Sequence, residues 1–287
     1  MNMKSTSRKQ AVVIAILPLA GLIMGQVPDG ASFALERSLM ISRIRERVRA
    51  SSKDAANREL ERALTAMASV ERERFVPESS RADAYGDTPL PIGYDQTISD
   101  AYVVAVMTAA LRLPAHANVL DVGTGSGYQA AVLALLADTV SSIEIVEPLA
   151  VQASFRLKDL HYDNVTVRAG DGFAGWPARA PFDGIVVAAG AAKVPQQLIE
   201  QLKPGGRLVM PIGSSWATEQ IIVVTKKLDG GLEECSLGWA MFVPLTGRGE
   251  RSAEARGLFD RTIPLCYKRP IVAPIFAPVT KQPPSTK

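Results

Sequence analysis

Short apolar runs and longer amphipathic segments alternate regularly along this chain from residue 118 onward. Apolar residues at three- and four-residue steps indicate helices, and short β-branched runs between them indicate strands. The expected strands are Val119–Val122, Val140–Val146, Val165–Arg168, Gly184–Ala188, Arg207–Pro211 and Gln220–Thr225. The expected intervening helices are Gln129–Ala137, Pro148–Leu160 and Pro195–Leu202. This alternation predicts an α/β fold with a doubly wound, mostly parallel sheet, and places ligands along the rim where the strands end.

Two amphipathic helices are predicted ahead of this succession. Leu35–Ser51 and Asn57–Val70 carry apolar residues at helical spacing, and a third helix is expected at Asp100–Leu111. We expect residues 35–112 to form an N-terminal helical cap on one α/β domain that spans residues 35–250.

A proline- and glycine-rich segment, Phe75–Ser99, lies between the second and third of these helices and shows no sustained periodicity. A loop of this length inside a compact domain is usually functional. Its last residue, Ser99, also suits the N-cap position of the helix that follows.

Composition excludes some classes of function. The chain has 287 residues, 47% hydrophobic content and a net charge of +3, with scattered basic residues, so nothing favours a nucleic-acid partner. Cys235 and Cys266 form no metal motif, and two histidines are too few for a zinc site. We expect no metal, a monomer, and free buried thiols unless export allows one disulfide.

The two ends of the chain differ from the middle. Lys4, Arg8 and Lys9 precede an apolar run, Ala11–Met24, that is too short for a comfortable membrane span. Small residues follow, so residues 1–34 are predicted to be a secretory signal peptide, without stable membrane insertion after cleavage. Residues 251–287 are predicted to be a Pro-rich extended tail.

The most informative motif lies at the end of the first of the alternating strands. Asp121 is followed by Gly123, Gly125 and Gly127, with Thr124 between the first two glycines. A strand, a glycine-rich turn and a helix bring bare backbone against a nucleotide-like cofactor. Asp121 can either engage the cofactor or orient this loop.

The glycine spacing separates two classes of cofactor. A dinucleotide fingerprint reads G-x-G-x-x-G, but Tyr128 stands where its third glycine belongs. D-x-G-x-G-x-G is instead the pattern of methyltransferases that use S-adenosylmethionine. We therefore expect this cofactor on the glycine loop.

Carboxylates follow the next two strands. Glu144 stands about 20 residues after the first strand, the place of a ribose-hydroxyl ligand in such folds. Glu147 is its rival, but Pro148 draws Glu147 into a first helical turn, where the helix dipole explains it. Asp171, with Gly172 leaving room beside it, can accept from an adenine amino group, although a plain turn explains the pair equally well.

The region from Arg74 to Gly247 resembles the protein-L-isoaspartate (D-aspartate) O-methyltransferase family. The matching segments are Arg74–Pro77, Pro91–Gly93, Gln96–Ser99, Leu120–Ala130, Gly170–Gly172, Gln201–Arg207 and Phe242–Leu245. The glycine motif alone is shared by many methyltransferases, whereas Thr-Ile-Ser before it and Phe-Val-Pro-Leu behind it are much more specific.

This resemblance implies a function and a set of roles. Such an enzyme methylates the free carboxylate of isoaspartyl or D-aspartyl residues in damaged proteins, and the ester then closes to a succinimide that starts repair. The active-site serine falls on Ser99, while Thr97, Ile98 and Val243 line the peptide cleft. The usual family location is the cytoplasm, so the signal-like N-terminus predicts an unusual one, the periplasm or envelope.

Three other functions remain open from the sequence. A methyltransferase for a small molecule needs the glycine motif but not Thr-Ile-Ser. A NAD-dependent oxidoreductase is disfavoured by Tyr128. A non-catalytic binding module is disfavoured because Ser99, Asp121 and Glu144 are all present.

Overall fold

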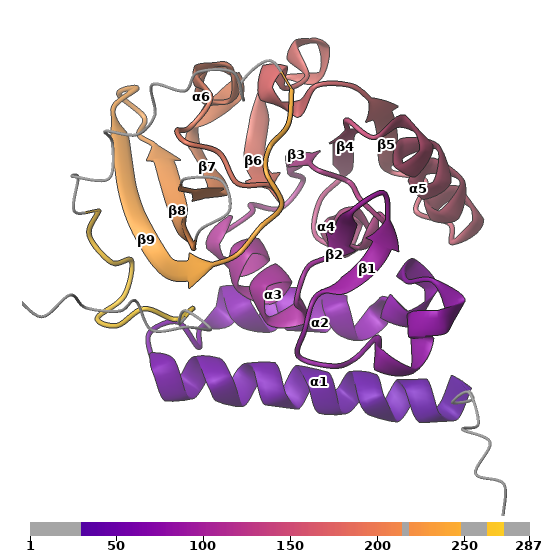
Figure 1. The fold of residues 1–287 in the computed structure, drawn as a ribbon. Coiled ribbons are helices and arrows are strands. Elements are labelled where there is room, and N and C mark those ends of the chain that lie inside the picture. Colours follow the sequence, from indigo (N-terminus) through magenta and orange to yellow (C-terminus); the bar gives the residue numbers. More distant parts are fainter. Residues whose placement is uncertain (1–29, 214–217, 248–262, 273–287) are drawn as a thin grey trace, which may run out of the picture.

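A seven-stranded sheet forms the centre of the protein in the computed structural model, which describes residues 30–213, 218–247 and 263–272 (Figure 1). Its strand order is β5-β4-β3-β6-β7-β8-β9. The strands are Asn118–Val122 (β3), Thr139–Glu144 (β4), Val165–Ala169 (β5), Phe182–Val187 (β6), Leu202–Ile212 (β7), Glu219–Lys226 (β8) and Leu232–Ala240 (β9). Strands β3 to β7 pair in parallel, and β8 and β9 pair antiparallel at one edge. The predicted doubly wound, mostly parallel sheet is confirmed.

The winding of the chain creates a crevice beside β3. The chain moves from β3 outward to β4 and β5, and then returns to place β6 on the other side of β3. A reversal of this kind leaves a crevice outside the carboxyl ends of the strands, where ligands bind in open α/β sheets. The residues that end β3, β4 and β6 are Val122, Glu144 and Val187.

Helices cover both faces of the sheet and stack below it in Figure 1. They are Gly30–Ser51 (α1), Arg58–Ser69 (α2), Ala101–Ala110 (α3), Tyr128–Ala134 (α4), Glu147–Asp159 (α5) and Gln196–Gln201 (α6). Single 3-10 turns are Arg72–Phe75 (η1), Glu78–Asp83 (η2), Gly172–Ala174 (η3) and Pro177–Arg179 (η4). Helix α1 packs on α2, and α2 packs on α3, which contacts the sheet. The N-terminal helical cap is therefore present as predicted.

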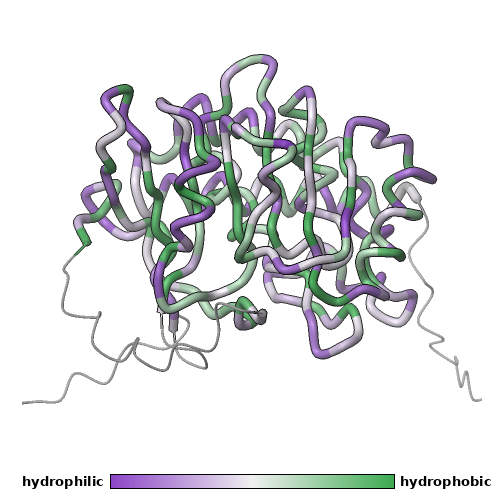
Figure 2. Tube along the Cα trace, turned by 90° about the horizontal axis from the view of Figure 1, so that it is seen from above, coloured by the Kyte–Doolittle hydropathy of each residue, from purple (hydrophilic) through white to green (hydrophobic). Residues whose placement is uncertain are grey.

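Alternation along each strand divides the core into two clusters, one on each face of the sheet. Val119 and Val209 belong to the cluster beneath α1 to α5, whereas their neighbours Leu120 and Leu208 belong to the cluster beneath α6. Successive side chains of a strand point to opposite faces, so these apolar strands require cover on both sides. Figure 2 shows hydrophobic segments in the interior and hydrophilic ones along the outer loops.

The proline- and glycine-rich segment before α3 contains a hairpin that the sequence did not predict. Strands Leu90–Gly93 (β1) and Gln96–Ile98 (β2) pair antiparallel. Tyr94 and Asp95, which join them, have positive φ angles of 54° and 57°. Two such residues form a turn whose twist matches that of a hairpin. The hairpin fixes the segment that leads directly to Ser99.

The N-cap of α3 is Asp100, not Ser99 as the sequence suggested. The Asp100 carboxylate accepts a hydrogen bond of 2.8 Å from the Tyr102 amide. Acceptance from the second amide of the helix is one of the two usual N-cap geometries. The hydroxyl of Ser99 is consequently not engaged in capping.

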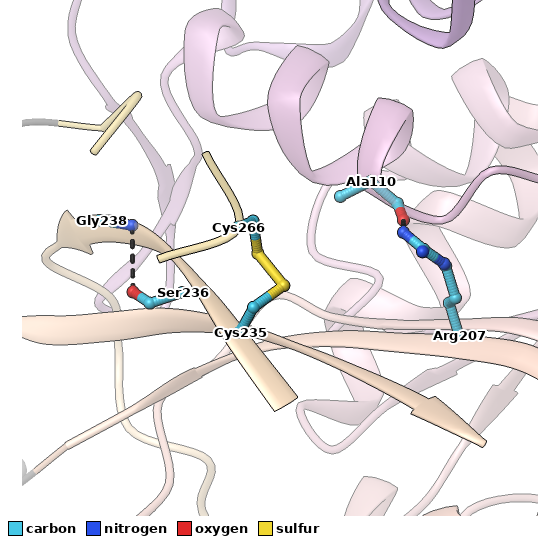
Figure 3. The surroundings of a disulfide bond; sticks show 6 residues. All are labelled: Ala110, Arg207, Cys235, Ser236, Gly238 and Cys266. Carbon is cyan, nitrogen blue, oxygen red and sulfur yellow. Dashed lines mark hydrogen bonds between the residues drawn. A yellow bond between two sulfur atoms is a disulfide. The ribbon is translucent and has the colours of Figure 1, made fainter. Parts of the chain in front are cut away.

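A disulfide between Cys235 and Cys266 replaces the expected pair of free thiols (Figure 3). Their Cα atoms lie 4.9 Å apart, although the residues are far apart in the sequence. Free thiols were the first expectation and one disulfide was the alternative for an exported chain; the structure has the disulfide. Sequence spacing alone gave no sign that residues 263–272 return to β9. We call residues 263–272 the C-terminal strap. The backbone amide of Cys266 in this strap donates to the Ser236 carbonyl on β9 at 2.9 Å.

The predicted end segments lie mostly outside the described residues. This holds for residues 1–29 of the predicted signal peptide, while residues 30–34 form the first turns of α1. Phe33 is buried and packs near Tyr85 with ring centroids 6.3 Å apart. Of the predicted tail, only the C-terminal strap is described. Within the described part of the chain, no helix has the length and apolar character needed to cross a membrane.

Candidate active site

A cleft opens at the carboxyl ends of β3, β4 and β6. Nine of the predicted site residues line it, namely Thr97, Ile98, Ser99, Gly123, Thr124, Gly125, Glu144, Gly172 and Val243. Three others, Asp121, Gly127 and Asp171, are not part of its lining. The structure thus brings the glycine loop, the β4 carboxylate and the Thr-Ile-Ser segment around one space.

The glycines of the loop have different tasks. Gly123 and Gly125 line the cleft and have φ angles of 88° and 52°. Gly127, with φ 93°, instead faces α5, since an added Cβ would lie 3.2 Å from a methyl group of Leu157. Gly127 therefore lets α4 and α5 pack closely, while the first two glycines expose backbone to the cleft.

Glu144 is buried at the end of β4 and holds the loop. Its carboxylate accepts from the amide of Gly125 at 2.7 Å and from that of Val146 at 2.9 Å. An ionised carboxylate has about four acceptor positions, so it can still accept from a ligand. Glu147, the alternative candidate, is exposed at the start of α5 and does not line the cleft. The geometry favours Glu144 of the two.

Asp121 lies behind the loop and orients it. Its side chain is fully buried and accepts a hydrogen bond of 2.7 Å from Ser142, whose hydroxyl also lies 2.5 Å from that of Thr124. Burial, with a smaller effect from the nearby Glu144 charge, raises the pKa of Asp121 to about 7 against the lowering effect of Ser142. Of the two roles predicted for Asp121, the structure favours positioning of the loop.

Replacing Asp121 by asparagine is expected to remove a pH dependence of stability. The raised pKa means that the folded protein keeps a proton between about pH 4 and pH 7 that the unfolded chain has lost, so the wild type loses stability as pH rises through that range. At 1.36 kcal/mol per pKa unit the effect is at most about 4 kcal/mol. Urea unfolding at several pH values checks this. If the free energies of unfolding of the wild type and Asp121→Asn differ by the same amount at every pH, the result would contradict this prediction.

Gly172 and Asp171 lie where the chain leaves β5. A Cβ on Gly172 would come within 2.3 Å of a methyl group of Val122, so the absence of a side chain keeps this wall of the cleft open. The Asp171 carboxylate accepts from the Phe173 amide at 2.9 Å and begins η3. The contact with adenine predicted for Asp171 stays a prediction.

Arg72, which sequence reasoning missed, fixes the segment around Ser99. Its buried guanidinium donates to the carbonyls of Ser99 and Ala84, each at 2.7 Å. It also lies 4.7 Å from the ring centroid of Tyr128, the first residue of α4. Arg72 therefore couples the Ser99 segment to the glycine loop. In the sequence, the position of Arg72 two residues before the Arg74–Pro77 motif was the only feature that could have drawn attention to it.

Replacing Arg72 by methionine is expected to lower the free energy of unfolding by about 3 kcal/mol, because two buried carbonyls lose their donor. The matched control is Arg156→Met. Arg156 is only partly buried and donates to one carbonyl, that of Ser126, at 2.8 Å, so its loss is expected to be about 1 kcal/mol. Chemical denaturation measures both variants. Equal losses would contradict the role given to Arg72.

The Phe242–Leu245 segment forms the wall opposite the loop, and a second overlooked residue holds it. Glu219, buried at the start of β8, accepts from the Phe242 amide at 3.1 Å. Gly190 exchanges backbone bonds with Val243 and Leu245, of 2.8 and 2.7 Å. These contacts fix Val243 at the cleft. Glu219 escaped notice because it stands at the edge of an expected strand.

Around this cleft and elsewhere in the described ranges, no group of three or more His, Cys, Asp or Glu side chains is arranged to hold a metal ion.

Comparison with known proteins first gives the class and then the family. A solved structure described as a protein-L-isoaspartate O-methyltransferase has the same fold, with a TM-score of 0.63 and 26% identity over 74% of this chain and 67% of its own. The site is thus that of a Rossmann-like methyltransferase. The family model for protein-L-isoaspartate(D-aspartate) O-methyltransferase matches residues 45–250. This chain belongs to that family.

Individual relatives agree with this assignment. The protein-L-isoaspartate O-methyltransferase 2 of Syntrophobacter fumaroxidans is 46% identical over 86% of this chain and 99% of its own length. The protein-L-isoaspartate O-methyltransferase of Opitutus terrae is 56% identical over 65% of this chain and 79% of its own. A Plasmodium falciparum structure of 23% identity, which covers 74% of this chain and 98% of its own, shares the fold with a TM-score of 0.61 and was solved with S-adenosyl-L-homocysteine.

Proposed function

We propose that this chain transfers a methyl group from S-adenosylmethionine to the free carboxylate of L-isoaspartyl and D-aspartyl residues in damaged proteins. The observation that carries this function is that Glu144, the glycine loop and Ser99 all line the same cleft. Family membership supports the same reaction. The methyl ester then closes to a succinimide without help from the enzyme, which starts repair.

The residues of the cleft fit S-adenosylmethionine. Glu144 retains acceptor positions for the two ribose hydroxyls, and a carboxylate is the side chain that accepts from both at once. Gly123, Thr124 and Gly125 present backbone for the methionine and ribose portions, and Gly172 leaves room for the adenine ring. When bound, this cofactor supplies a sulfonium methyl group that an ionised carboxylate accepts directly.

Ser99 is proposed to position the substrate. A carboxylate with a pKa of about 3.9 is already ionised at neutral pH, so the reaction requires no general base. It requires alignment, which supplies many kcal/mol of catalysis. Ser99 lines the cleft, Asp100 rather than Ser99 caps α3, and Arg72 fixes the Ser99 carbonyl. The Ser99 hydroxyl can therefore donate to one carboxylate oxygen and direct the other.

Thr97, Ile98 and Val243 are proposed to hold the peptide on either side of this carboxylate. Thr97 is exposed at the cleft, whereas Ile98 is buried and anchors β2. Val243, from the Phe242–Leu245 segment, lines the same cleft. The hairpin and this segment are fixed to the fold by separate contacts, so together they form a preformed groove.

Radiolabelled methyl transfer to an isoaspartyl peptide, measured beside its normal aspartyl twin, tests the function. We expect base-labile methyl ester on the isoaspartyl peptide alone. Transfer to neither peptide, combined with transfer to a small carboxylic acid, would favour the alternative of a small-molecule methyltransferase.

We propose that the protein works as an exported monomer in the periplasm or envelope, without a nucleic-acid partner. The basic and apolar N-terminus supports export, and so does the Cys235–Cys266 disulfide, because such bonds persist in oxidising compartments. Sequencing of the mature N-terminus and cell fractionation test this. A retained N-terminus in the cytoplasmic fraction would overturn it, and sedimentation measures the oligomeric state.

A further inference from the structure

The cleft continues past Ser99 into a second hollow. Both spaces share Thr97, Ser99, Val103, Ala188, Phe242 and Val243 as lining residues. The cofactor residues Glu144 and Gly125 line only the first space. The second hollow therefore lies on the substrate side of Ser99, where the chain next to a bound isoaspartyl residue has to run.

The C-terminal strap closes one end of this second hollow. Val272 lines it, and Val272 accepts from the Trp239 amide at 3.0 Å and donates to the Leu237 carbonyl at 3.0 Å. Gly238 lies directly beneath, where a Cβ would come within 1.9 Å of the Val272 carbonyl oxygen. The strap is thus seated on β9 as closely as the backbone allows.

The disulfide fastens the other end of the strap to the same strand. Cys266 is bonded to Cys235, and Figure 3 shows this link beside the hydrogen bond that the Gly238 amide donates to the Ser236 hydroxyl. The Tyr102 hydroxyl on α3 donates to the carbonyl of Ile271, which is itself buried. Covalent and hydrogen-bonded attachments at Cys266 and Ile271 therefore precede Val272, the residue of the strap that lines the hollow.

The hollow is predominantly apolar. Its lining outside the shared residues is Arg47, Pro89, Asp100, Trp239, Ala240, Met241 and Val272. The Arg47 guanidinium lies 3.9 Å from the Tyr102 ring centroid and 3.9 Å from the Asp100 carboxylate. Its charge is already balanced, so it does not call for an acidic ligand. Met241, in contrast, is 61% exposed at the rim.

We propose that this hollow is a subsite for an aliphatic or aromatic side chain next to the isoaspartyl residue of the protein substrate, with the C-terminal strap as its wall. This inference rests on the proposed function. The hollow is continuous with the Ser99 cleft, so its occupant is expected to be part of the same substrate chain. The apolar lining indicates that this part is an apolar side chain. The chain thereby selects among damaged sites by the residue beside them.

Steady-state kinetics with isoaspartyl hexapeptides that carry either leucine or aspartate in the flanking positions tests the subsite. For the wild type we expect a KM about tenfold lower for the leucine peptide, as apolar pockets discriminate by such factors. Met241→Lys is expected to abolish or reverse this preference, while the KM for S-adenosylmethionine stays unchanged. The matched control is Leu228→Lys on the β8–β9 turn, where Leu228 is 85% exposed and does not line the hollow; it is expected to behave as wild type.

A double variant, Cys235→Ser with Cys266→Ser, examines the strap separately. We expect its KM for the leucine peptide to rise severalfold, with the KM for S-adenosylmethionine unchanged. Methyl transfer without any flanking preference in the wild type, or equal effects of Met241→Lys and Leu228→Lys, would overturn the subsite and leave the proposed function intact. Absence of transfer to both peptides would overturn the proposed function and the subsite with it.

Discussion

Replacing Ser99 by alanine is expected to lower kcat for methylation of an isoaspartyl peptide by about 100-fold, the usual effect of losing one preorganised donor. The affinity for S-adenosylmethionine is expected to stay within about twofold, because Ser99 also lines the second hollow, whereas Glu144 and Gly125 line only the cleft. Single-turnover methyl transfer and calorimetry measure the two quantities. Equal losses in both would contradict a positioning role for Ser99.

Stability separates this role of Ser99 from that of a helix cap. Replacing an N-cap residue by alanine typically costs about 1 kcal/mol. Since Asp100 accepts from the Tyr102 amide, Asp100→Ala is expected to show that loss, whereas Ser99→Ala is expected to unfold at the same urea concentration as the wild type. If Ser99→Ala is destabilised but has a normal kcat, Ser99 acts as a helix cap and does not position the substrate.

Replacing Glu144 by alanine is expected to weaken S-adenosylmethionine binding by about 100-fold, since hydrogen bonds to a charged group contribute roughly 1.5–3 kcal/mol. The carboxylate also accepts from the amides of Gly125 and Val146, so its loss loosens the loop as well. Glu144→Gln keeps one acceptor oxygen and is expected to show an intermediate affinity by calorimetry.

Glu147→Ala is the matched control for Glu144. Glu147 is an identical side chain three residues later, exposed at the start of α5. We expect its replacement to leave the affinity unchanged. Unchanged binding in Glu144→Ala together with a large loss in Glu147→Ala would transfer the ribose contact to the second residue.

Hydrophobic alternation predicted the sheet well because its strands are buried on both faces. Strands β3 to β6 and β8 lie within two residues of the expected ranges, whereas β7 begins at Leu202 instead of Arg207. The edge strand β9 was not foreseen, since Glu233 and Glu234 are exposed and interrupt any apolar run. The β1–β2 hairpin was missed for a related reason: its turn is made by Tyr94 and Asp95 rather than by glycine or asparagine.

Contacts between distant segments were beyond sequence reasoning. The Cys235–Cys266 disulfide depends on the return of the strap to β9. Arg72 and Glu219 act through backbone carbonyls and amides that no local pattern identifies. Conversely, Asp121 was found by its motif, but its burial behind the loop favours positioning over cofactor contact. The sequence motifs identified residues of the cleft, but their individual roles became clear only from the contacts in the structure.

A crystal structure of the wild type with S-adenosyl-L-homocysteine and an isoaspartyl peptide tests the two-sided cleft most directly. We predict the substrate carboxylate within hydrogen-bond distance of the Ser99 hydroxyl and the ribose hydroxyls on Glu144. A peptide carboxylate bound away from Ser99, or a ribose held without Glu144, would contradict this arrangement.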